Sequence, residues 1–368
     1  MEVIRIDYNH VQEDLCKSSC CIGFFDGLHT GHQALLENCI QVAKEKNVKS
    51  GLITFDPDPW KIFFPERVCR HITTLDDRIF LASAMGIEVM YIITFSKDFA
   101  ALDVDAFHML LHKMNVSYIT CGFDFKYASK NSGNVQTLKT QNYFEVSVIE
   151  SVNSKNEKIS SSRIEPLIQS GKMDLANELL GYMYSIEGVI EHGFKRGSTL
   201  LNFPTANLGA NPDYLVPSSG VYAGFVCVND TLYGSMINVG NNPTFENKKV
   251  SIEAHIFDFD QDIYDQKVRF FFLKKTRNEI RFDGFESLKK QLESDIITCK
   301  KVILKESSYV NETAKLGIRK FLSLNNFLIY LKRSEGEIMA KEYIELEPGN
   351  EYGVISLNKT VFLQSQRT

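Results

Sequence analysis

Several features of membrane and secreted proteins are missing from this sequence of 368 residues. No apolar run approaches the roughly 20 residues that a membrane-spanning helix needs. The chain opens with MEVIRIDYNH, which has neither the basic nor the apolar segment of a secretory signal. The formal net charge of -5 provides no general excess of positive charge for nucleic acid. We therefore expect a cytoplasmic protein with no membrane or nucleic-acid partner, in which any anion site is local.

A disulfide framework is also missing, although the chain contains eight cysteines. They are spread over a long chain rather than concentrated in a short one, so we predict reduced thiols. Cys16, Cys20 and Cys21 lie close together, but no second Cys/His cluster with zinc-ligand spacing accompanies them. Because Cys20 and Cys21 belong to an apolar segment, we interpret them as core residues.

The remaining composition is that of a globular protein, with 44% hydrophobic and 24% charged residues. The length suits two large domains and a small third unit. From about Cys20 to Leu180, short apolar segments such as SGLITF and VMYIITF alternate with helical ones such as HQALLENCIQVAKEK. This alternation predicts an α/β domain over residues 1–182, with a Rossmann-like parallel sheet wrapped by helices.

After about Met183 the pattern changes to short strands separated by Gly, Asn and Asp turns. Segments such as GVYAGFVCVND and TLYGSMINVG, followed by the helical FESLKKQLESDI, predict a closed antiparallel β-barrel with one covering helix over residues 183–299. The rest, residues 300–368, predicts a small α+β extension made of a helix and a hairpin turning at residues 348–350. No role is assigned to this extension.

The segment CIGFFDGLHTGH has the features of a phosphate-binding turn. Gly23 allows a ligand to approach the backbone, Gly27 permits a turn closed to bulky residues, and Gly31 keeps the first helical turn clear. Free N–H groups at that helix start attract phosphate. His29 and His32 lie on one helix face, where their imidazoles can donate hydrogen bonds to a phosphoryl oxygen. The pattern favours phosphoryl or nucleotidyl transfer; the alternative is that both histidines only cap or pack against the helix.

A second candidate site lies in GFKRGSTLLNFPTAN. Pro204 fixes its backbone angle, and Thr205 and Asn207 alternate onto one side of an extended segment. Two neutral oxygens at neighbouring positions suit Mg²⁺ held by a nucleotide. The preceding loop adds two glycines that let a phosphate approach and two candidate cations: Gly193, Gly197, Lys195 and Arg196.

These motifs resemble known families. FDGLHTGH resembles the H-x-G-H signature of cytidylyltransferase-like nucleotidyltransferases, and the longer GFFDGLHTGH resembles in particular the prokaryotic riboflavin kinase/FAD synthetase family. Further blocks follow in the family's order, namely TFDPDPWKIFFP, ITTLDDR, CGFDFKYASKNSG and ISSSRI, then FPTAN, NVGNNPTF and SIEAHIFDF. The resemblance covers about residues 20–298.

The resemblance implies a bifunctional enzyme of flavin cofactor synthesis. The barrel would phosphorylate riboflavin with ATP to give FMN and ADP, and the first domain would adenylylate FMN with ATP to give FAD and pyrophosphate. Flavins are then substrates and products, Mg²⁺ accompanies ATP, and self-association is left open.

It also implies roles for individual residues. In the first domain, His29 and His32 would hold the ATP phosphates. The other nucleotide-side residues would be Gly23, Asp26, Ser160, Ser161 and Ser162, and the flavin-side residues Pro57, Pro59, Asp124 and Phe125. In the barrel, Thr205 and Asn207 would bind the Mg-nucleotide, with Gly193, Lys195 and Gly197 in the loop before them. Glu253 would be the general base for the riboflavin 5′-hydroxyl; its alternative reading is an outward strand glutamate.

The sequence departs from the family pattern at the first site. Glu165 occupies the position of the family's arginine after the serine turn, and Asn131 and Asn134 replace an arginine and an acid. Arg163, two residues before Glu165, is not an obvious substitute. Because charge-assisted contacts are the strong ones, two alternatives stay open: a riboflavin kinase with impaired adenylylation, and a flavin-responsive regulatory protein.

Overall fold

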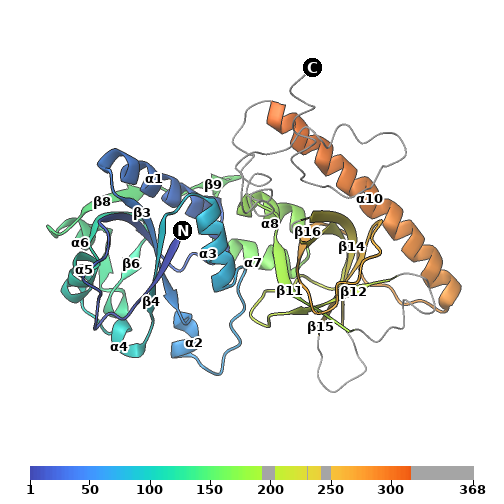
Figure 1. Cartoon of the computed structure of the whole chain (residues 1–368), viewed down its shortest axis with the longest axis horizontal. Coiled ribbons are helices and arrows are strands. Elements are labelled where there is room, and N and C mark those ends of the chain that lie inside the picture. The colour runs from blue at the N-terminus through green and yellow to red at the C-terminus, as the bar shows by residue number, and fades with distance from the viewer. Residues whose placement is uncertain (193–203, 230, 242–249, 316–368) are drawn as a thin grey trace. The chain divides into compact units, whose positions relative to one another are not determined.

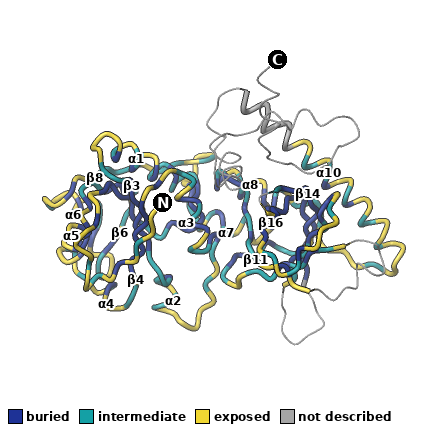
Figure 2. Tube along the Cα trace, viewed as in Figure 1, coloured by how far each residue is buried: buried dark blue, intermediate teal, exposed yellow. Residues whose placement is uncertain are grey.

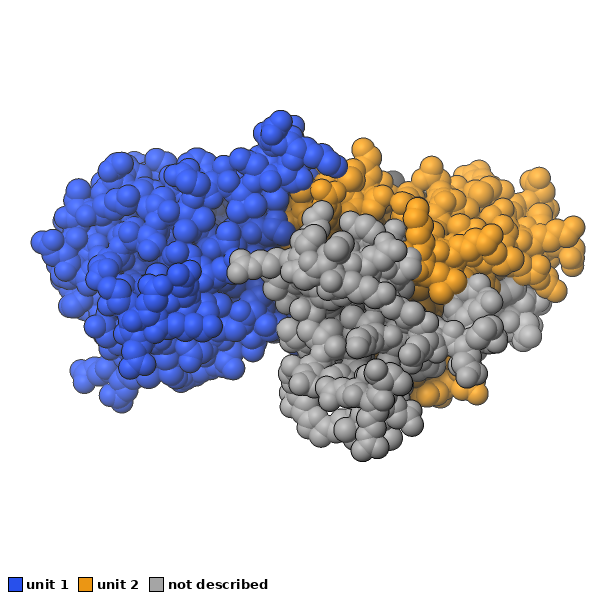
Figure 3. Space-filling model, turned by 90° about the horizontal axis from the view of Figure 1, so that it is seen from above, with its two compact units in different colours: residues 1–163 blue, residues 164–368 orange. Residues whose placement is uncertain are grey.

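The computed structural model describes residues 1–192, 204–229, 231–241 and 250–315 (Figure 1). The chain forms two compact units, Met1–Arg163 and Ile164–Thr368 (Figure 3). Two helices, α7 (Ser161–Gln169) and α8 (Met173–Leu180), precede the barrel, and their helical periodicity is visible in SSSRIEPLIQSGKMDLANELLG. The domain boundary predicted at residue 182 comes after this pair, whereas the compact units divide near the start of α7.

The first unit is built on a six-stranded sheet with the order β1-β4-β3-β2-β5-β8. Every neighbouring pair is parallel, which confirms the predicted α/β class. The strands are β1 (Glu2–Ile6), β2 (Ser18–Ile22), β3 (Lys49–Asp56), β4 (Val89–Thr94), β5 (Val116–Gly122) and β8 (Glu145–Ile149). The edge strands β1 and β8 were not predicted from the sequence.

Helices and short hairpins connect these strands. The helical elements are η1 (Asp26–Leu28), α1 (Thr30–Lys46), α2 (Pro59–Phe63), α3 (Leu75–Ala84), α4 (Lys97–Ala100), α5 (Val104–Lys113), η2 (Ser129–Asn131) and α6 (Val135–Lys139). The hairpins pair β6 (Lys126–Tyr127) with β7 (Gly133–Asn134), and β9 (Asn153–Ser154) with β10 (Glu157–Lys158). The central strands are buried along nearly their whole length (Figure 2), as expected for a parallel sheet covered on both faces.

The strand order reverses beside β2. The chain passes from β2 through α1 to β3 on one side and then to β4, and it returns to place β5 on the other side of β2. Parallel sheets bind ligands beyond the carboxyl ends of their strands at such a reversal. Because β2, β3 and β5 are parallel, the loops that follow them lie at the same edge of the sheet.

The second unit contains a closed antiparallel barrel with the order β11-β12-β15-β14-β13-β16, which confirms the predicted barrel. Its strands are β11 (Ser185–Glu191), β12 (Ala206–Ala210), β13 (Gly220–Val228), β14 (Thr231–Asn241), β15 (Val250–Ile256) and β16 (Lys267–Arg277). Helix α10 (Phe285–Lys315) packs against β13, β14 and β16 as the covering helix.

Helix α10 is anchored to the barrel by a buried ion pair. The guanidinium of Arg277 lies 2.6 Å from Asp295, whose carboxylate also accepts from Gln291 at 2.8 Å. The helix continues through the boundary predicted at residue 300. The predicted hairpin near residue 348 lies outside the described residues.

Two further predictions concern membrane spans and cysteines. Within the described ranges, no helix has both the length and the hydropathy needed to cross a membrane. All eight cysteines are free thiols. Cys20 and Cys21 are fully buried in β2, which confirms their predicted core role.

Candidate functional sites

The turn between β2 and α1 has the backbone conformation that its glycine was predicted to allow. Gly27 has φ 75°, in the left-handed region that favours glycine. Its N–H donates to the Thr73 hydroxyl at 2.8 Å. A Cβ on Gly31 would lie 3.1 Å from the His29 ring and 3.4 Å from the Ile159 carbonyl oxygen. Both glycines therefore have the local roles predicted for them.

His29 and His32 form a stacked pair at the start of α1. Their ring centroids are 3.7 Å apart with an interplanar angle of 16°. His29 caps the helix, because its Nδ1 accepts a hydrogen bond from the backbone N–H of His32 at 3.3 Å. The capping role considered for the histidines is thus present at His29. Because Nδ1 accepts this hydrogen bond, the proton of a neutral His29 is on Nε2, which can donate to a ligand.

Both imidazoles are held in the neutral form. Burial lowers the pKa of His29 to about 4, although the nearby Asp26 carboxylate opposes that effect. Burial lowers the pKa of His32 well below its usual value, and the charges of His29 and Lys158 add to the effect. At neutral pH each ring therefore offers one N–H donor rather than two. An approaching phosphate would favour protonation of either ring.

The serine turn is joined to the loop after β2. The hydroxyl of Ser161 donates to the carbonyl oxygen of Asp26 at 2.9 Å, across 135 residues of sequence. The hydroxyls of Ser160 and Ser162 lie 3.1 Å apart. The structure thus brings the predicted serines to the loop that leads into the histidine pair.

Lys158, in β10, is a cation of this site that sequence reasoning missed. Its ammonium group forms an ion pair with Asp124, which follows β5, and lies 5.0 Å from the centroid of the Phe123 ring. Its charge also acts on both histidines. Arg163 instead donates to the carbonyl oxygens of Ser154 and Glu157. Arg163 was predicted not to be an obvious substitute for the family's arginine, and its guanidinium binds the backbone of the β9–β10 hairpin. Lys158 was missed because its partner, Asp124, is distant in the sequence.

The predicted flavin-side residues follow the two strands that flank β2. Pro57 directly follows β3 and Pro59 begins α2, whereas Asp124 and Phe125 follow β5. The Phe125 ring stacks on Tyr127 with centroids 5.5 Å apart. These residues therefore come from loops at the same sheet edge as the histidines. Asn134, in place of the family's second acid, caps α6 by accepting from the N–H groups of Gln136 and Thr137.

The barrel site is set by strand register. Asn207 of β12 pairs with Glu253 of β15, and the Thr205 hydroxyl lies 3.5 Å from the Glu253 carboxylate, at the long limit of a hydrogen bond. Burial raises the pKa of Glu253, and the contact with Thr205 opposes that rise. On the other side of β15, Asn238 pairs with Glu253; this neighbour was not predicted. The structure brings together the three residues predicted for this site.

His255 is a neighbour of the barrel site. Its Nδ1 lies 3.0 Å from the carbonyl oxygen of Pro204, so it contacts the backbone just before Thr205. Gly193, Lys195 and Gly197 lie outside the described residues. Their roles stay predictions.

Two family models match the chain. The FAD synthetase model matches residues 11–163, and the riboflavin kinase model matches residues 180–303. The first match ends where the first compact unit ends, and the second spans the described barrel strands and the first part of α10.

Relatives match over both units. A bifunctional riboflavin kinase/FMN adenylyltransferase from Bacillus subtilis is 36% identical over 304 residues, covering 80% of this chain and 96% of the relative. A protein of the same description from Listeria monocytogenes is 37% identical over 279 residues, covering 74% and 88%. A solved structure described as a macrolide-efflux protein from Streptococcus pneumoniae has a TM-score of 0.76 and 31% identity, covering 82% and 99%.

Proposed function

The chain belongs to the family of bifunctional riboflavin kinase/FMN adenylyltransferases, and we propose that its two described sites divide the two reactions between them. Family membership confirms the resemblance predicted from the sequence. The proposed division is carried by one observation: among the described residues, each unit contains a cluster of the side chains that one reaction needs. The sheet edge has N–H donors and a lysine, and the barrel has a carboxylate beside two neutral oxygens.

In the first unit, the FMN phosphate attacks the α-phosphorus of ATP, and pyrophosphate leaves. This reaction needs positioned donors for negatively charged oxygens more than it needs a strong base. His29 and His32, the serine turn and Lys158 supply such donors. Asp26 ties the turn after β2 to the segment before α3, because its carboxylate accepts hydrogen bonds from Ile72 and Thr73.

In the second unit, the 5′-hydroxyl of riboflavin attacks the γ-phosphorus of ATP. Glu253 accepts the hydroxyl proton, and its raised pKa brings it closer to the operating pH, which suits a general base. The Thr205 hydroxyl and the Asn207 amide oxygen are hard ligands that fit Mg²⁺. Two oxygen ligands are too few to bind Mg²⁺ by themselves. They would hold a cation that arrives with the nucleotide and neutralises phosphate charge.

The first site keeps a cation despite its departures from the family pattern. The sequence-based alternative, a kinase with impaired adenylylation, depended on the loss of positive charge at Glu165 and Asn131. Lys158 supplies positive charge beside both histidines. We therefore favour retained FAD synthesis. The eight free thiols favour a reducing compartment such as the cytoplasm.

The test uses the full-length protein with riboflavin, ATP and Mg²⁺, followed by chromatographic separation of FMN and FAD. We expect FMN to form first and FAD to follow, with both lost when Mg²⁺ is omitted. FMN without FAD would favour the kinase-only alternative. Flavin binding without either product would favour the regulatory alternative.

A further inference from the structure

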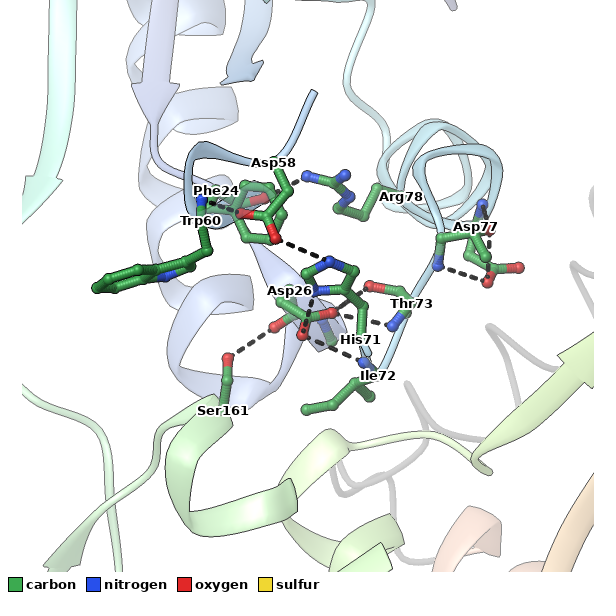
Figure 4. Close-up of polar contacts among 12 residues, drawn as sticks. Phe24, Asp26, Asp58, Trp60, His71, Ile72, Thr73, Asp77, Arg78 and Ser161 are labelled. Carbon is green, nitrogen blue, oxygen red and sulfur yellow. Dashed lines mark hydrogen bonds and ion pairs between the residues drawn. The ribbon is translucent and has the colours of Figure 1, made fainter. Parts of the chain in front are cut away.

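A partly buried histidine outside the predicted site joins two loops of that site. His71 lies in the segment between α2 and α3, and its ring stands between the carboxylates of Asp26 and Asp58 (Figure 4). Its Nδ1 is 3.6 Å from Asp26 and its Nε2 is 3.2 Å from Asp58. Both carboxylates are buried, and 14% of the His71 side chain is exposed. Water therefore screens these two ion pairs little.

Each carboxylate is fixed to its own loop. Asp26 belongs to the turn after β2 and accepts from the Ile72 and Thr73 N–H groups at 3.1 and 2.9 Å. Asp58 follows β3 and caps α2 by accepting from the Trp60 N–H at 2.8 Å. His71 consequently bridges the turn that leads to the nucleotide-side histidines and the helix that begins at the flavin-side Pro59.

The surroundings keep this bridge charged. Burial lowers the pKa of His71, but the two neighbouring carboxylates, Asp26 and Asp58, outweigh it and raise the pKa to about 9. Burial raises the pKa of Asp58, whereas His71 and the Trp60 N–H bring it below its usual value.

Other charged and titratable groups surround the bridge. From α3, Arg78 donates to the Phe24 carbonyl oxygen and lies 4.3 Å from the Phe24 ring, which itself packs on His71. The charge of Arg78 interacts with Asp26, Asp56, Asp58 and Asp77. Cys69, two residues before His71, faces Asp58. The cluster therefore holds two cationic side chains between carboxylates from several loops.

We propose that His71 is a positioning residue for FAD synthesis, whose imidazolium ties the nucleotide-side turn at Asp26 to the flavin-side helix at Asp58. The inference rests on the proposed function of the first site. Joining two bound substrates depends steeply on their relative placement, and small displacements are costly. His71 contacts neither substrate. It fixes the loops that hold the two substrates.

The first test compares His71→Gln with His10→Gln. The glutamine at position 71 retains hydrogen-bonding groups but removes the positive charge. His10 also faces an aspartate, Asp7, at 3.3 Å, but its side chain is 86% exposed, so it is a matched control. We expect kcat for FAD synthesis from FMN to fall about tenfold or more in His71→Gln, with smaller changes in both KM values. Riboflavin phosphorylation by the same protein should be unchanged, and His10→Gln should behave as the parent.

The second test is a pH profile, which a purely structural role would not shift. In the parent protein, kcat for FAD synthesis should fall with a midpoint near pH 9, as His71 loses its proton. Asp58→Asn removes one of the two charges that hold this proton, so its midpoint should move to lower pH. Kinase profiles recorded on the same samples control for general alkaline inactivation.

The outcomes separate the two levels of inference. A parent protein that makes no FAD from FMN overturns the function proposed for the first site. A parent that makes FAD, with unchanged kcat in His71→Gln or an unshifted profile in Asp58→Asn, overturns the positioning role alone. If His71→Gln does not fold, as judged by the fluorescence of Trp60, the only tryptophan, the Asp58→Asn profile decides the question.

Discussion

The two sites reach a similar kind of chemistry by different construction. The sheet-edge site gathers side chains from loops after three parallel strands and ties them by contacts such as that of Ser161 with Asp26, 135 residues apart. The barrel site takes Asn207 and Glu253 from paired strands, where the backbone ladder fixes their register. The first geometry therefore depends on side chains that hold loops, whereas the second depends on the barrel itself.

The difference extends to charge. The sheet-edge site combines neutral histidines with Lys158 and the charged bridge at His71. In the barrel site, burial raises the pKa of the Glu253 carboxyl group. The two activities should consequently respond differently to substitution and to pH.

The largest expected effect is at Glu253. Glu253→Gln keeps the shape of the side chain but removes the base, so riboflavin phosphorylation should fall about 10²- to 10⁴-fold. Conversion of supplied FMN to FAD should stay unchanged. Steady-state rates of the two reactions check this, with the exposed Glu286→Gln in α10 as control. Equal loss of both activities would contradict separate sites.

His32→Asn should produce the reverse pattern. His32 is preferred to His29 because His29 also caps α1, so its loss would mix stability with activity. Removing one well-placed donor to a developing charge costs about 10²- to 10³-fold in rate. We expect that loss in FAD synthesis from FMN and none in FMN formation. A full FAD rate would mean that the stacked pair serves α1 rather than the nucleotide.

The next effect concerns the stability of the first unit at alkaline pH. Because the folded pKa of His71 is raised from 6.5 to about 9, its contribution is complete below about pH 6.5 and is lost as pH rises through about 9. The change corresponds to at most about 3 kcal/mol in free energy of unfolding. Urea titrations followed by Trp60 fluorescence report on this unit. In His71→Gln this part of the pH dependence should vanish; an unchanged slope would count against the charged bridge.

The smallest predicted effect belongs to Lys158. Lys158→Gln should raise the KM for ATP in FAD synthesis about tenfold, the value of one modest charge-assisted contact, and leave the kinase KM unchanged. Lys155→Gln, an exposed lysine of the same hairpin, is the control. If Lys158→Gln leaves the KM unaltered, the ammonium group serves only Asp124.

Much of the fold could be predicted because its central elements have strong patterns. VMYIITF contains the buried β4, and the helical segment HQALLENCIQVAKEK lies in α1. The edge strands were missed for physical reasons. In β1, Glu2, Val3 and Arg5 are exposed, and β8 is only half-buried. Neither strand has the continuous apolar run that identifies a central parallel strand.

The sites were predictable where a motif is local and not where a contact is distant. Thr205 and Asn207 are two residues apart, so their common side of an extended segment could be expected. Lys158 acquires its role through Asp124, 34 residues away, and His71 through carboxylates on two other loops. Such pairings depend on the strand order, which local spacing does not reveal.

Mixing two defective proteins tests the central claim of two separate sites most directly. Glu253→Gln and His32→Asn are each incubated with riboflavin, ATP and Mg²⁺, alone and together, and FMN and FAD are quantified over time. We predict that Glu253→Gln alone forms almost no FMN, that His32→Asn alone accumulates FMN, and that the mixture makes FAD after a lag in which FMN builds up. A mixture that makes no more FAD than the separate proteins, although His32→Asn still supplies FMN, would contradict the account.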